Sequence, residues 1–235
     1  MQTVILAGGL GTRMRPLTET IPKPMLTVAG KPFLQHQLEL LSRHGLRRVL
    51  LLAAYLGEQI EQYFADGAKF GCEIRYSFER SPMGTGGALK LAESRLEEEF
   101  LVLNGDTYLD LSYSQFSLEF QKGGAEALVA AYCGSAGEPL VPADTVARNL
   151  GVNESGKVWA YRKKHPEGLS HVDAGVVALR KTILGRVPVG VACSLEENIY
   201  PELIREGQMR AWVTEEPFID IGTPEGLKAL TEKLA

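Results

Sequence analysis

Short apolar runs alternate with amphipathic stretches through the first half of the chain. The apolar runs lie at residues 3–6, 49–53, 72–78 and 100–104, and each has the length of a buried strand. Apolar side chains recur at helical spacing in the stretches 33–44, 58–64 and 85–96. Strands without polar alternation, separated by helices, are typical of a mostly parallel sheet that helices cover on both faces. The pattern therefore predicts an α/β fold.

The second half of the chain is less regular but predicts further elements of both kinds. Strands are expected at 127–133, 158–161, 175–179, 209–214 and 218–221. The sequence SLEE at 194–197 is a capping-box pattern that predicts a helix to about residue 205, and Thr223 before Pro224 predicts the start of a last helix. Residues 134–149 carry Gly and Pro with little periodicity and are predicted to form a loop. Nothing is typical of a flexible linker, so one domain is expected over residues 1–235.

Composition and charge narrow the class of protein. The chain has 235 residues, of which 45% are hydrophobic and 23% charged, as in ordinary globular domains. A net charge of −4 argues against a nucleic-acid binder, because such proteins carry a basic footprint. No apolar run approaches the ~18 residues of a membrane span, and the N-terminus lacks the features of a signal peptide. Three well-separated cysteines are typical of reduced thiols. We therefore expect a cytoplasmic protein with no nucleic-acid or membrane partner.

The first predicted strand runs directly into a glycine-rich loop with the sequence LAGGLGTRMRPLT at 6–18. Glycines allow backbone N–H groups to approach phosphate oxygens, and the Arg13 guanidinium adds charge-assisted donors. The loop is not a dinucleotide fingerprint, because Met14 stands where the third glycine is required, and it has no Walker lysine. It suits a polyphosphate, although a tight glycine turn with solvent-facing arginines would explain such a cluster by itself.

A lysine between two prolines follows the loop, in the sequence IPKPM at 21–25. Each proline fixes its own φ and restricts the residue before it, so the segment is expected to be extended. Held in this way, Lys23 would be a positioned point charge. An exposed loop lysine is the alternative.

The two motifs together resemble the N-terminal signature of the sugar-phosphate nucleotidyltransferase family, and the resemblance extends from residue 3 to about residue 228. It implies a single Rossmann-like, three-layer α/β domain with a mostly parallel mixed sheet. It also implies that the glycine loop holds the phosphates of a nucleoside triphosphate and that Arg13 and Lys23 are catalytic, stabilising charge on the phosphates. The residues that it assigns to the nucleotide here are Leu6, Ala7, Gly8, Gly9, Gly11, Thr12 and Arg13, together with Asn104 at the end of a predicted strand.

Two aspartates are the candidate metal ligands. Asp106 follows the strand 100–104, and the carboxyl ends of strands in α/β sheets face the ligand crevice. Asp220 lies in the apolar run FIDIG, where an aspartate needs a partner, which a metal or a capped helix would supply. Both segments resemble the metal-binding segments of the family. The resemblance implies that Asp106 is catalytic, that Asp106 and Asp220 bind Mg²⁺, and that Gly105 and Asp220 lie at the substrate.

The base and sugar sites are expected in the second glycine cluster, ERSPMGTGGA at 79–88, which resembles the family's nucleobase segment. The resemblance assigns Glu79, Gly84 and Thr85 to the nucleotide. Lys164 aligns with a family lysine that binds the sugar phosphate, but its neighbours Lys163 and His165 replace the usual glutamate and proline.

Asp173 is also assigned to the substrate, although it stands where asparagine is usual in the family. An ionised aspartate accepts hydrogen bonds but cannot donate them. The sugar pocket is therefore expected to depart from the family pattern.

The resemblance implies transfer of a nucleoside monophosphate from an NTP to a sugar 1-phosphate, with release of pyrophosphate. The segments 82–89, 194–207 and 218–226 are most similar to guanylyltransferases that act on mannose or D-glycero-D-manno-heptose 1-phosphate, which favours GTP and leaves UTP, dTTP and CTP open. A regulatory homologue that binds a nucleotide sugar without turnover is an alternative. A glycosyltransferase is another, but no D-x-D motif lies mid-chain. Family members often form homodimers, so a homodimer is a candidate assembly.

Overall fold

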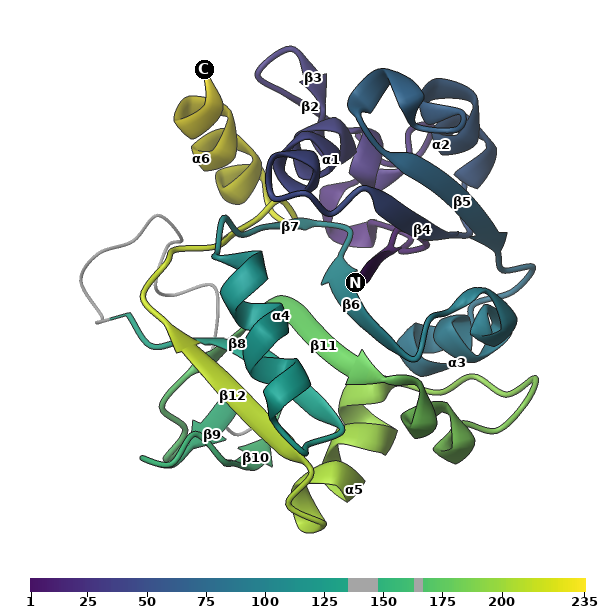
Figure 1. The fold of residues 1–235 in the computed structure, drawn as a ribbon. Coiled ribbons are helices and arrows are strands. Elements are labelled where there is room, and N and C mark those ends of the chain that lie inside the picture. Colours follow the sequence, from purple (N-terminus) through teal and green to yellow (C-terminus); the bar gives the residue numbers. More distant parts are fainter. Residues whose placement is uncertain (135–147, 163–166) are drawn as a thin grey trace.

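A single mixed sheet organises the residues that the computed structural model describes, which are 1–134, 148–162 and 167–235. Its strand order is β12-β8-β11-β6-β1-β4-β5 (Figure 1). β1 pairs in parallel with β4 and β6, β4 with β5, and β8 with β12, whereas β11 is antiparallel to both β6 and β8. The predicted mostly parallel mixed sheet is thus confirmed. The strands are β1 (Gln2–Leu6), β4 (Arg48–Ala53), β5 (Glu73–Phe78), β6 (Glu99–Asn104), β8 (Ala127–Tyr132), β11 (Val172–Arg180) and β12 (Met209–Thr214).

Helices cover both faces of this sheet. Successive residues of a strand point to opposite faces, so Ile5 of β1 joins one apolar core and Val4 joins the other. The core that contains Ile5 also contains buried side chains of α1, α2, α4 and α6, whereas α3 and α5 contribute to the core that contains Val4. The three-layer α/β architecture follows. The helices are α1 (Phe33–Arg43), α2 (Gly57–Phe64), α3 (Gly84–Leu91), α4 (Tyr113–Lys122), α5 (Tyr200–Arg205) and α6 (Pro224–Leu234).

Within the described ranges, three short antiparallel pairs lie outside the main sheet, and one of them brings distant parts of the chain together. β7 (Thr107–Tyr108) pairs with β13 (Ile219–Asp220), and the N–H of Ile221 donates to the carbonyl of Asp106 at 2.9 Å. This pair places the segment around Asp220 beside the end of β6. The other pairs are β2 (Thr27–Val28) with β3 (Lys31–Pro32) and β9 (Leu150–Val152) with β10 (Val158–Tyr161).

Two predicted helices differ from the structure by more than one residue at one end. α3 ends at Leu91, where the N–H of Ala92 bonds to the carbonyls of both Ala88 and Leu89, and the chain tightens into the 3₁₀ turn η4 (Glu93–Arg95). Other 3₁₀ turns are η1 (Thr12–Met14), η2 (Lys23–Met25), η3 (Ala68–Phe70) and η5 (Lys181–Arg186).

The predicted capping box at 194–197 is present, since the Ser194 side chain accepts from the N–H of Glu197 at 3.2 Å. The first turn behind it, η6 (Leu195–Ile199), is a π-helix rather than an α-helix. Pro201 has no N–H to donate to the carbonyl four residues before it, so an α-helical bond is missing at this point.

Residues 135–147 of the predicted loop 134–149 lie outside the described part of the chain. No helix in the described part has both the length and the apolar character that crossing a membrane requires.

Candidate active site

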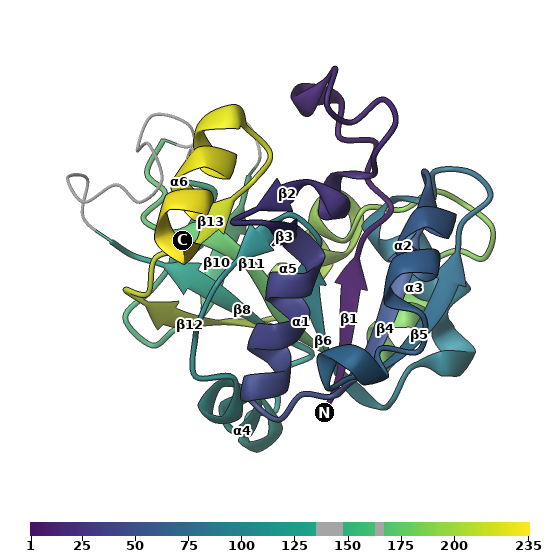
Figure 2. The ribbon, with the colours of Figure 1, turned by 90° about the horizontal axis from the view of Figure 1, so that it is seen from above.

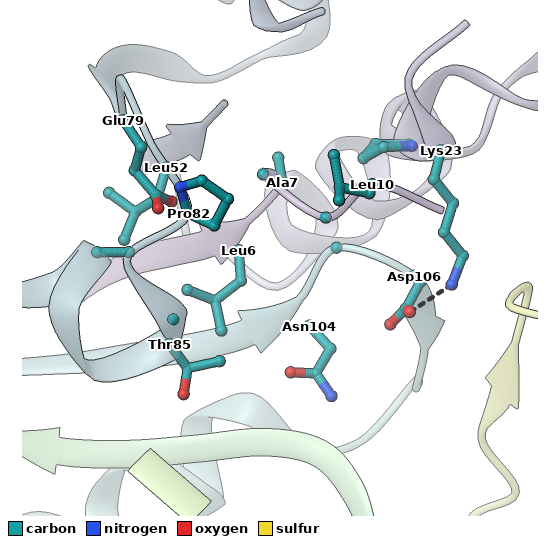
Figure 3. Close-up of a pocket in the computed structure, with 16 residues that line it drawn as sticks. Leu6, Ala7, Leu10, Lys23, Leu52, Glu79, Pro82, Thr85, Asn104 and Asp106 are labelled. Carbon is teal, nitrogen blue, oxygen red and sulfur yellow. Dashed lines mark hydrogen bonds and ion pairs between the residues drawn. The ribbon is translucent and has the colours of Figure 1, made fainter. Parts of the chain in front are cut away.

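A cavity of about 400 Å³ opens at the carboxyl ends of β1, β4 and β6 (Figure 3). Ligand sites of α/β sheets lie at this edge, because the loops that follow the strands converge there. The cavity draws residues from the glycine loop, the start of α3 and the end of β6. Its lining residues are Leu6, Ala7, Gly8, Gly9, Leu10, Lys23, Pro24, Leu52, Glu79, Pro82, Gly84, Thr85, Ala88, Asn104, Gly105 and Asp106.

The glycines of the first loop have different structural roles. Gly11 has a φ of +61°, and a Cβ there would approach Thr18 Cγ2 to 2.9 Å, so its turn requires glycine. A Cβ on Gly9 would meet nothing within 4 Å, since this residue faces the open cavity. Figure 2 shows the segment after the loop extending beyond the carboxyl end of β1. Thr12 and Arg13 lie in this exposed part, in η1 and beside the cavity rather than in its lining.

Lys23 is the charged centre of the site. Its side chain is only 9% exposed, and Nζ lies 2.5 Å from Asp106 Oδ2 and 3.8 Å from Asp220 Oδ1 (Figure 3 shows the bond to Asp106). The alternative of an exposed loop lysine is therefore wrong. The expected extended segment is also wrong at this residue, because Lys23 begins the turn η2, closed by a bond from the N–H of Leu26 to its carbonyl.

The two aspartates meet at this lysine from different elements. Asp106 follows β6, and Asp220 ends β13. Burial raises the pKa of Asp220, and the Asp106 carboxylate raises it further, whereas Lys23 acts in the opposite direction. Arg13 adds a second positive charge, with Nη2 3.9 Å from Asp220 Oδ2. The site thus holds two carboxylates and two cations within ion-pair distance, an arrangement that suits phosphate groups and a metal ion.

The donor set fits Mg²⁺ only if a substrate supplies further oxygens. Mg²⁺ in phosphate-transferring sites usually takes one or two carboxylates, with phosphate oxygens and waters in the remaining positions. Asp106 and Asp220 supply that many carboxylates. No cluster of three or more His, Cys, Asp or Glu suited to a metal occurs among the described residues. The protein therefore offers an open site of hard oxygen ligands.

Gln37 holds the end of β6 in place and was not among the predicted site residues. Its side-chain amide, from α1, donates to the carbonyls of Asn104 at 2.9 Å and Thr107 at 2.7 Å. Gly105 completes this turn, since its N–H donates to the carbonyl of Leu6. The only sequence signal for this role was a glutamine on the apolar face of the predicted helix 33–44.

The opposite wall of the cavity is built around Glu79 and Thr85. Glu79 Oε2 accepts from the N–H of Met83 at 2.8 Å, and burial raises the pKa of Glu79 despite this bond. Thr85 donates its hydroxyl to Glu196 at 2.9 Å and accepts from the N–H of Leu195 at 2.8 Å. The Thr85 hydroxyl therefore joins α3 to η6. Thr85 also lines the cavity, as expected. Gly84, with φ of +70°, packs against the carbonyl of Cys193.

A smaller cavity adjoins the first one, since Leu6 and Asn104 line both. It contains Asp173, whose Oδ1 accepts from the N–H of Gly175 at 2.9 Å and whose Oδ2 accepts from the Tyr161 hydroxyl at 3.0 Å. The structure thus places Asp173 in the lining of the smaller cavity and not in that of the main one. Lys164, together with Lys163 and His165, lies outside the described residues.

Comparison with known proteins identifies the family. The model of the nucleotidyl transferase family matches residues 2–139. The chain belongs to the nucleotidyl transferase family. Among curated relatives, a D-glycero-α-D-manno-heptose 1-phosphate guanylyltransferase of Campylobacter jejuni is 34% identical over 225 residues, which cover 96% of each chain. A mannose-1-phosphate guanylyltransferase of Mycobacterium tuberculosis is 32% identical, with 96% of this chain and 62% of the relative covered.

A solved relative of this nucleotidyl transferase is HddC from Yersinia pseudotuberculosis. It superimposes with a TM-score of 0.82 at 30% identity, covering 100% of this chain and 99% of the other. The same Yersinia protein is also known complexed with GMP-PN. These relatives confirm the predicted membership of the sugar-phosphate nucleotidyltransferases and the predicted fold. The roles of individual site residues stay predictions.

Proposed function

We propose that this nucleotidyl transferase transfers GMP from GTP to a sugar 1-phosphate, giving a GDP-sugar and pyrophosphate. Mannose 1-phosphate or D-glycero-α-D-manno-heptose 1-phosphate is the favoured acceptor. The observation that carries the proposal is the placement of Lys23 between Asp106 and Asp220, at the cavity below the glycine loop. The guanylyltransferases of Campylobacter and Mycobacterium among its relatives support the choice of base and of sugar.

The reaction is an in-line displacement. An oxygen of the sugar 1-phosphate forms a bond to the α-phosphorus of GTP, while the bond from that phosphorus to the bridging oxygen breaks and pyrophosphate leaves with the electron pair. A phosphate oxygen is already anionic at neutral pH, so no general base is needed. Catalysis then consists of alignment and charge stabilisation.

The chain's own residues provide both. Backbone N–H groups of the glycine loop, three of whose residues, Gly8, Gly9 and Leu10, line the cavity, would bind phosphate oxygens, and a Cβ on Gly9 would meet nothing within 4 Å. Lys23 and Arg13 offset the negative charge that gathers on the phosphates. Asp106 and Asp220 would hold Mg²⁺, which supplies further charge neutralisation on phosphate oxygens when bound.

A different nucleoside triphosphate as the donor is the main alternative. A UTP–glucose-1-phosphate uridylyltransferase of Synechocystis is 32% identical, with 88% of this chain and 56% of the relative covered. Uridylyl transfer therefore remains a competing specificity within the same reaction, with thymidylyl and cytidylyl transfer behind it.

Pyrophosphate release with Mg²⁺ tests the proposal. GTP, UTP, dTTP, CTP and ATP are each paired with mannose, D-glycero-D-manno-heptose and glucose 1-phosphates. We expect release with GTP and one of the first two sugars. Release with another NTP alone would replace guanylyl transfer by that specificity. Binding of a nucleotide sugar without release from any pair would support a regulatory role and contradict the proposal.

A further inference from the structure

Gln37 is an almost completely buried polar residue in the middle of α1. Its exposed fraction is 1%, and the neighbouring residues on the same face of the helix, Leu34, Leu38 and Leu41, belong to the apolar core. A buried amide destabilises a protein unless hydrogen bonds replace those that it made with water. The partners of this amide therefore indicate why a polar residue is present in the core.

Both amide hydrogens of Gln37 are used on one short turn of the backbone. Nε2 donates to the carbonyl of Asn104 at 2.9 Å and to the carbonyl of Thr107 at 2.7 Å. Because both partners are acceptors, the nitrogen of the amide faces them and the oxygen points away. Oε1 is buried and has no hydrogen-bond partner in the described part of the chain, which by itself lowers stability. The side chain is therefore suited to donating to this turn rather than to packing in the core.

The turn that Gln37 holds determines where both aspartates of the site begin. Asn104 and Thr107 stand on either side of Asp106, so the two bonds fix the backbone before and after this residue. Thr107 is also the register partner of Asp220 in the pairing of β7 with β13. One buried side chain thus supports the backbone from which both carboxylates project.

The two carboxylates need this support because they share one small region. Lys23 Nζ lies 2.5 Å from an oxygen of Asp106 and 3.8 Å from an oxygen of Asp220. Like charges so close to each other repel, and the repulsion is strong where burial lowers the effective dielectric constant. A backbone that is held on both sides of Asp106 resists this repulsion.

From this arrangement we infer that Gln37 is a positioning residue, which keeps the carboxylates of Asp106 and Asp220 at the separation that one divalent cation requires. The inference rests on the metal site of the proposed function and adds to it a residue that touches neither metal nor substrate. Mg²⁺ demands near-ideal octahedral geometry, so displacement of one ligand weakens its binding. Groups that orient metal ligands typically account for about 10–100-fold in metal affinity or activity.

The substitution Gln37→Met tests the inference, because methionine is unbranched like glutamine but has no group that donates to the two carbonyls. Mn²⁺ is the probe, since its paramagnetic resonance signal distinguishes free from bound metal without turnover. The protein is saturated with a GTP analogue that has a methylene bridge between the α- and β-phosphorus, and binding of Mn²⁺ by the free analogue is subtracted. We expect the Kd for Mn²⁺ to rise about tenfold or more in Q37M. The Kd for the analogue without metal should change less than about twofold, because Gln37 lines no part of the cavity.

His36→Leu is the matched control. His36 precedes Gln37 in α1, is 9% exposed, and has Nε2 2.8 Å from the carbonyl oxygen of Val28. H36L therefore also loses a buried hydrogen bond to a carbonyl, but that carbonyl does not belong to the turn around Asp106. Both variants should unfold at lower urea concentration than the wild type, whereas only Q37M should lose Mn²⁺ affinity. An unchanged Kd for Mn²⁺ in Q37M, or an equal loss in the two variants, would overturn the inference.

Gln37→Glu provides a second measurement that does not depend on how well Q37M folds. Burial and the two carbonyl oxygens disfavour the ionised form of the new carboxyl group, and the neutral form can donate one of the two hydrogen bonds. We expect a Kd for Mn²⁺ between those of the wild type and Q37M. Wild-type Mn²⁺ affinity in a Q37E protein of lowered urea stability would show that the bonds to the turn serve stability alone, and the inference would be wrong.

Failure of this inference and failure of the proposed function have different signatures. Mn²⁺ affinity that depends on Gln37, without pyrophosphate release from any pair of NTP and sugar 1-phosphate, would refute only the transfer reaction. Pyrophosphate release by the wild type, with unchanged Mn²⁺ affinity in Q37M, would refute only the role of Gln37. A wild-type protein that binds no Mn²⁺ beyond that held by the free analogue would also overturn the inference, because no metal site would exist for Gln37 to position.

Discussion

At the scale of single residues, the site depends on charges that are balanced inside the protein. Lys23 is almost fully buried, and the carboxylates of Asp106 and Asp220 are each about a quarter exposed. A buried ammonium group destabilises the fold unless an opposite charge pairs with it. Here two carboxylates are its partners, and the lysine stabilises their negative charges in turn. Removing one of these three charges therefore changes both the free energy of unfolding and the electrostatic potential at the proposed triphosphate site.

Lys23→Met should lower the rate of pyrophosphate release by about 100-fold or more, because the loss of a preorganised cation at a phosphoryl-transfer site has costs of this order. Lys31→Met is the control, since Lys31 is an exposed lysine that pairs with Glu39. Steady-state assays of both variants decide the matter, and a Lys23 variant with near-wild-type kcat would exclude this catalytic role.

Glu79→Gln should change the pH dependence of stability. Burial raises the native pKa of Glu79, so the native state binds its proton more tightly than the unfolded state does. The wild-type protein consequently loses stability as the pH rises from about 4.3, the unfolded value, through the native pKa. Glutamine cannot ionise, so E79Q should unfold at higher urea concentration than the wild type at pH 7–8, and the gain should vanish near pH 4.

Urea titrations across this pH range, with the exposed Glu154→Gln as the control for loss of one negative charge, measure the difference. An advantage of E79Q that grows towards low pH would show that the sign of this argument is wrong.

At the scale of elements, the site depends on the close packing of the turn after β6 against the end of β1. β6 and β1 run in parallel, and Gly105 at the end of β6 lies against the carbonyl of Leu6. A Cβ at Gly105 would be 2.3 Å from that oxygen, which leaves no room for any other residue. The close approach matters because Asp106 comes next in the chain and takes its position from this turn.

Gly105→Ala should therefore destabilise the fold by about 1–3 kcal/mol, as overpacking does elsewhere, and should displace Asp106 as well. Gly9→Ala is the matched control for stability, because its Cβ would meet nothing within 4 Å. Chemical unfolding with a constant m-value gives the comparison. Equal stability of the two variants would mean that the β6 end relaxes without cost.

At the scale of the whole molecule, the site joins parts of the chain that fold around different sections of the sheet. The glycine loop and β6 belong to its parallel part, whereas Asp173 comes from the antiparallel β11 and Asp220 from a segment near the C-terminus. Ligands that bridge these parts should stabilise the molecule as a unit.

GTP and Mg²⁺ together should raise the melting temperature clearly, since a ligand at 100 times its Kd adds about 2.7 kcal/mol to the free energy of unfolding. Mg²⁺ alone should have little effect, because the described residues supply no group of three or more metal ligands without a substrate. Differential scanning fluorimetry with each component separately and with both measures this. A full shift with Mg²⁺ alone would contradict an open metal site.

The sequence alone determined what depends on local pattern. Apolar runs between amphipathic helices predicted the parallel part of the sheet, and the glycine loop after the first strand was predicted as a binding loop, which lines the cavity in the structure. Both predictions were possible because strand ends and flexible glycines are local features. Asp106 was found in the same way, at the end of a buried strand. Its neighbour Gly105 was assigned to the substrate by the family resemblance, and the contact with Leu6 that requires glycine was not visible in the sequence.

Only the tertiary structure decided which of these segments meet. The antiparallel insertion of β11 between β6 and β8, the pairing of β7 with β13 that brings Asp220 to Lys23, and the bond between Thr85 and Glu196 all join residues far apart in the chain. Periodicity reports which face of an element is buried, but it does not report what packs against that face. The pairing of the site's charges therefore arises from long-range packing, and it became visible only when the chain was folded.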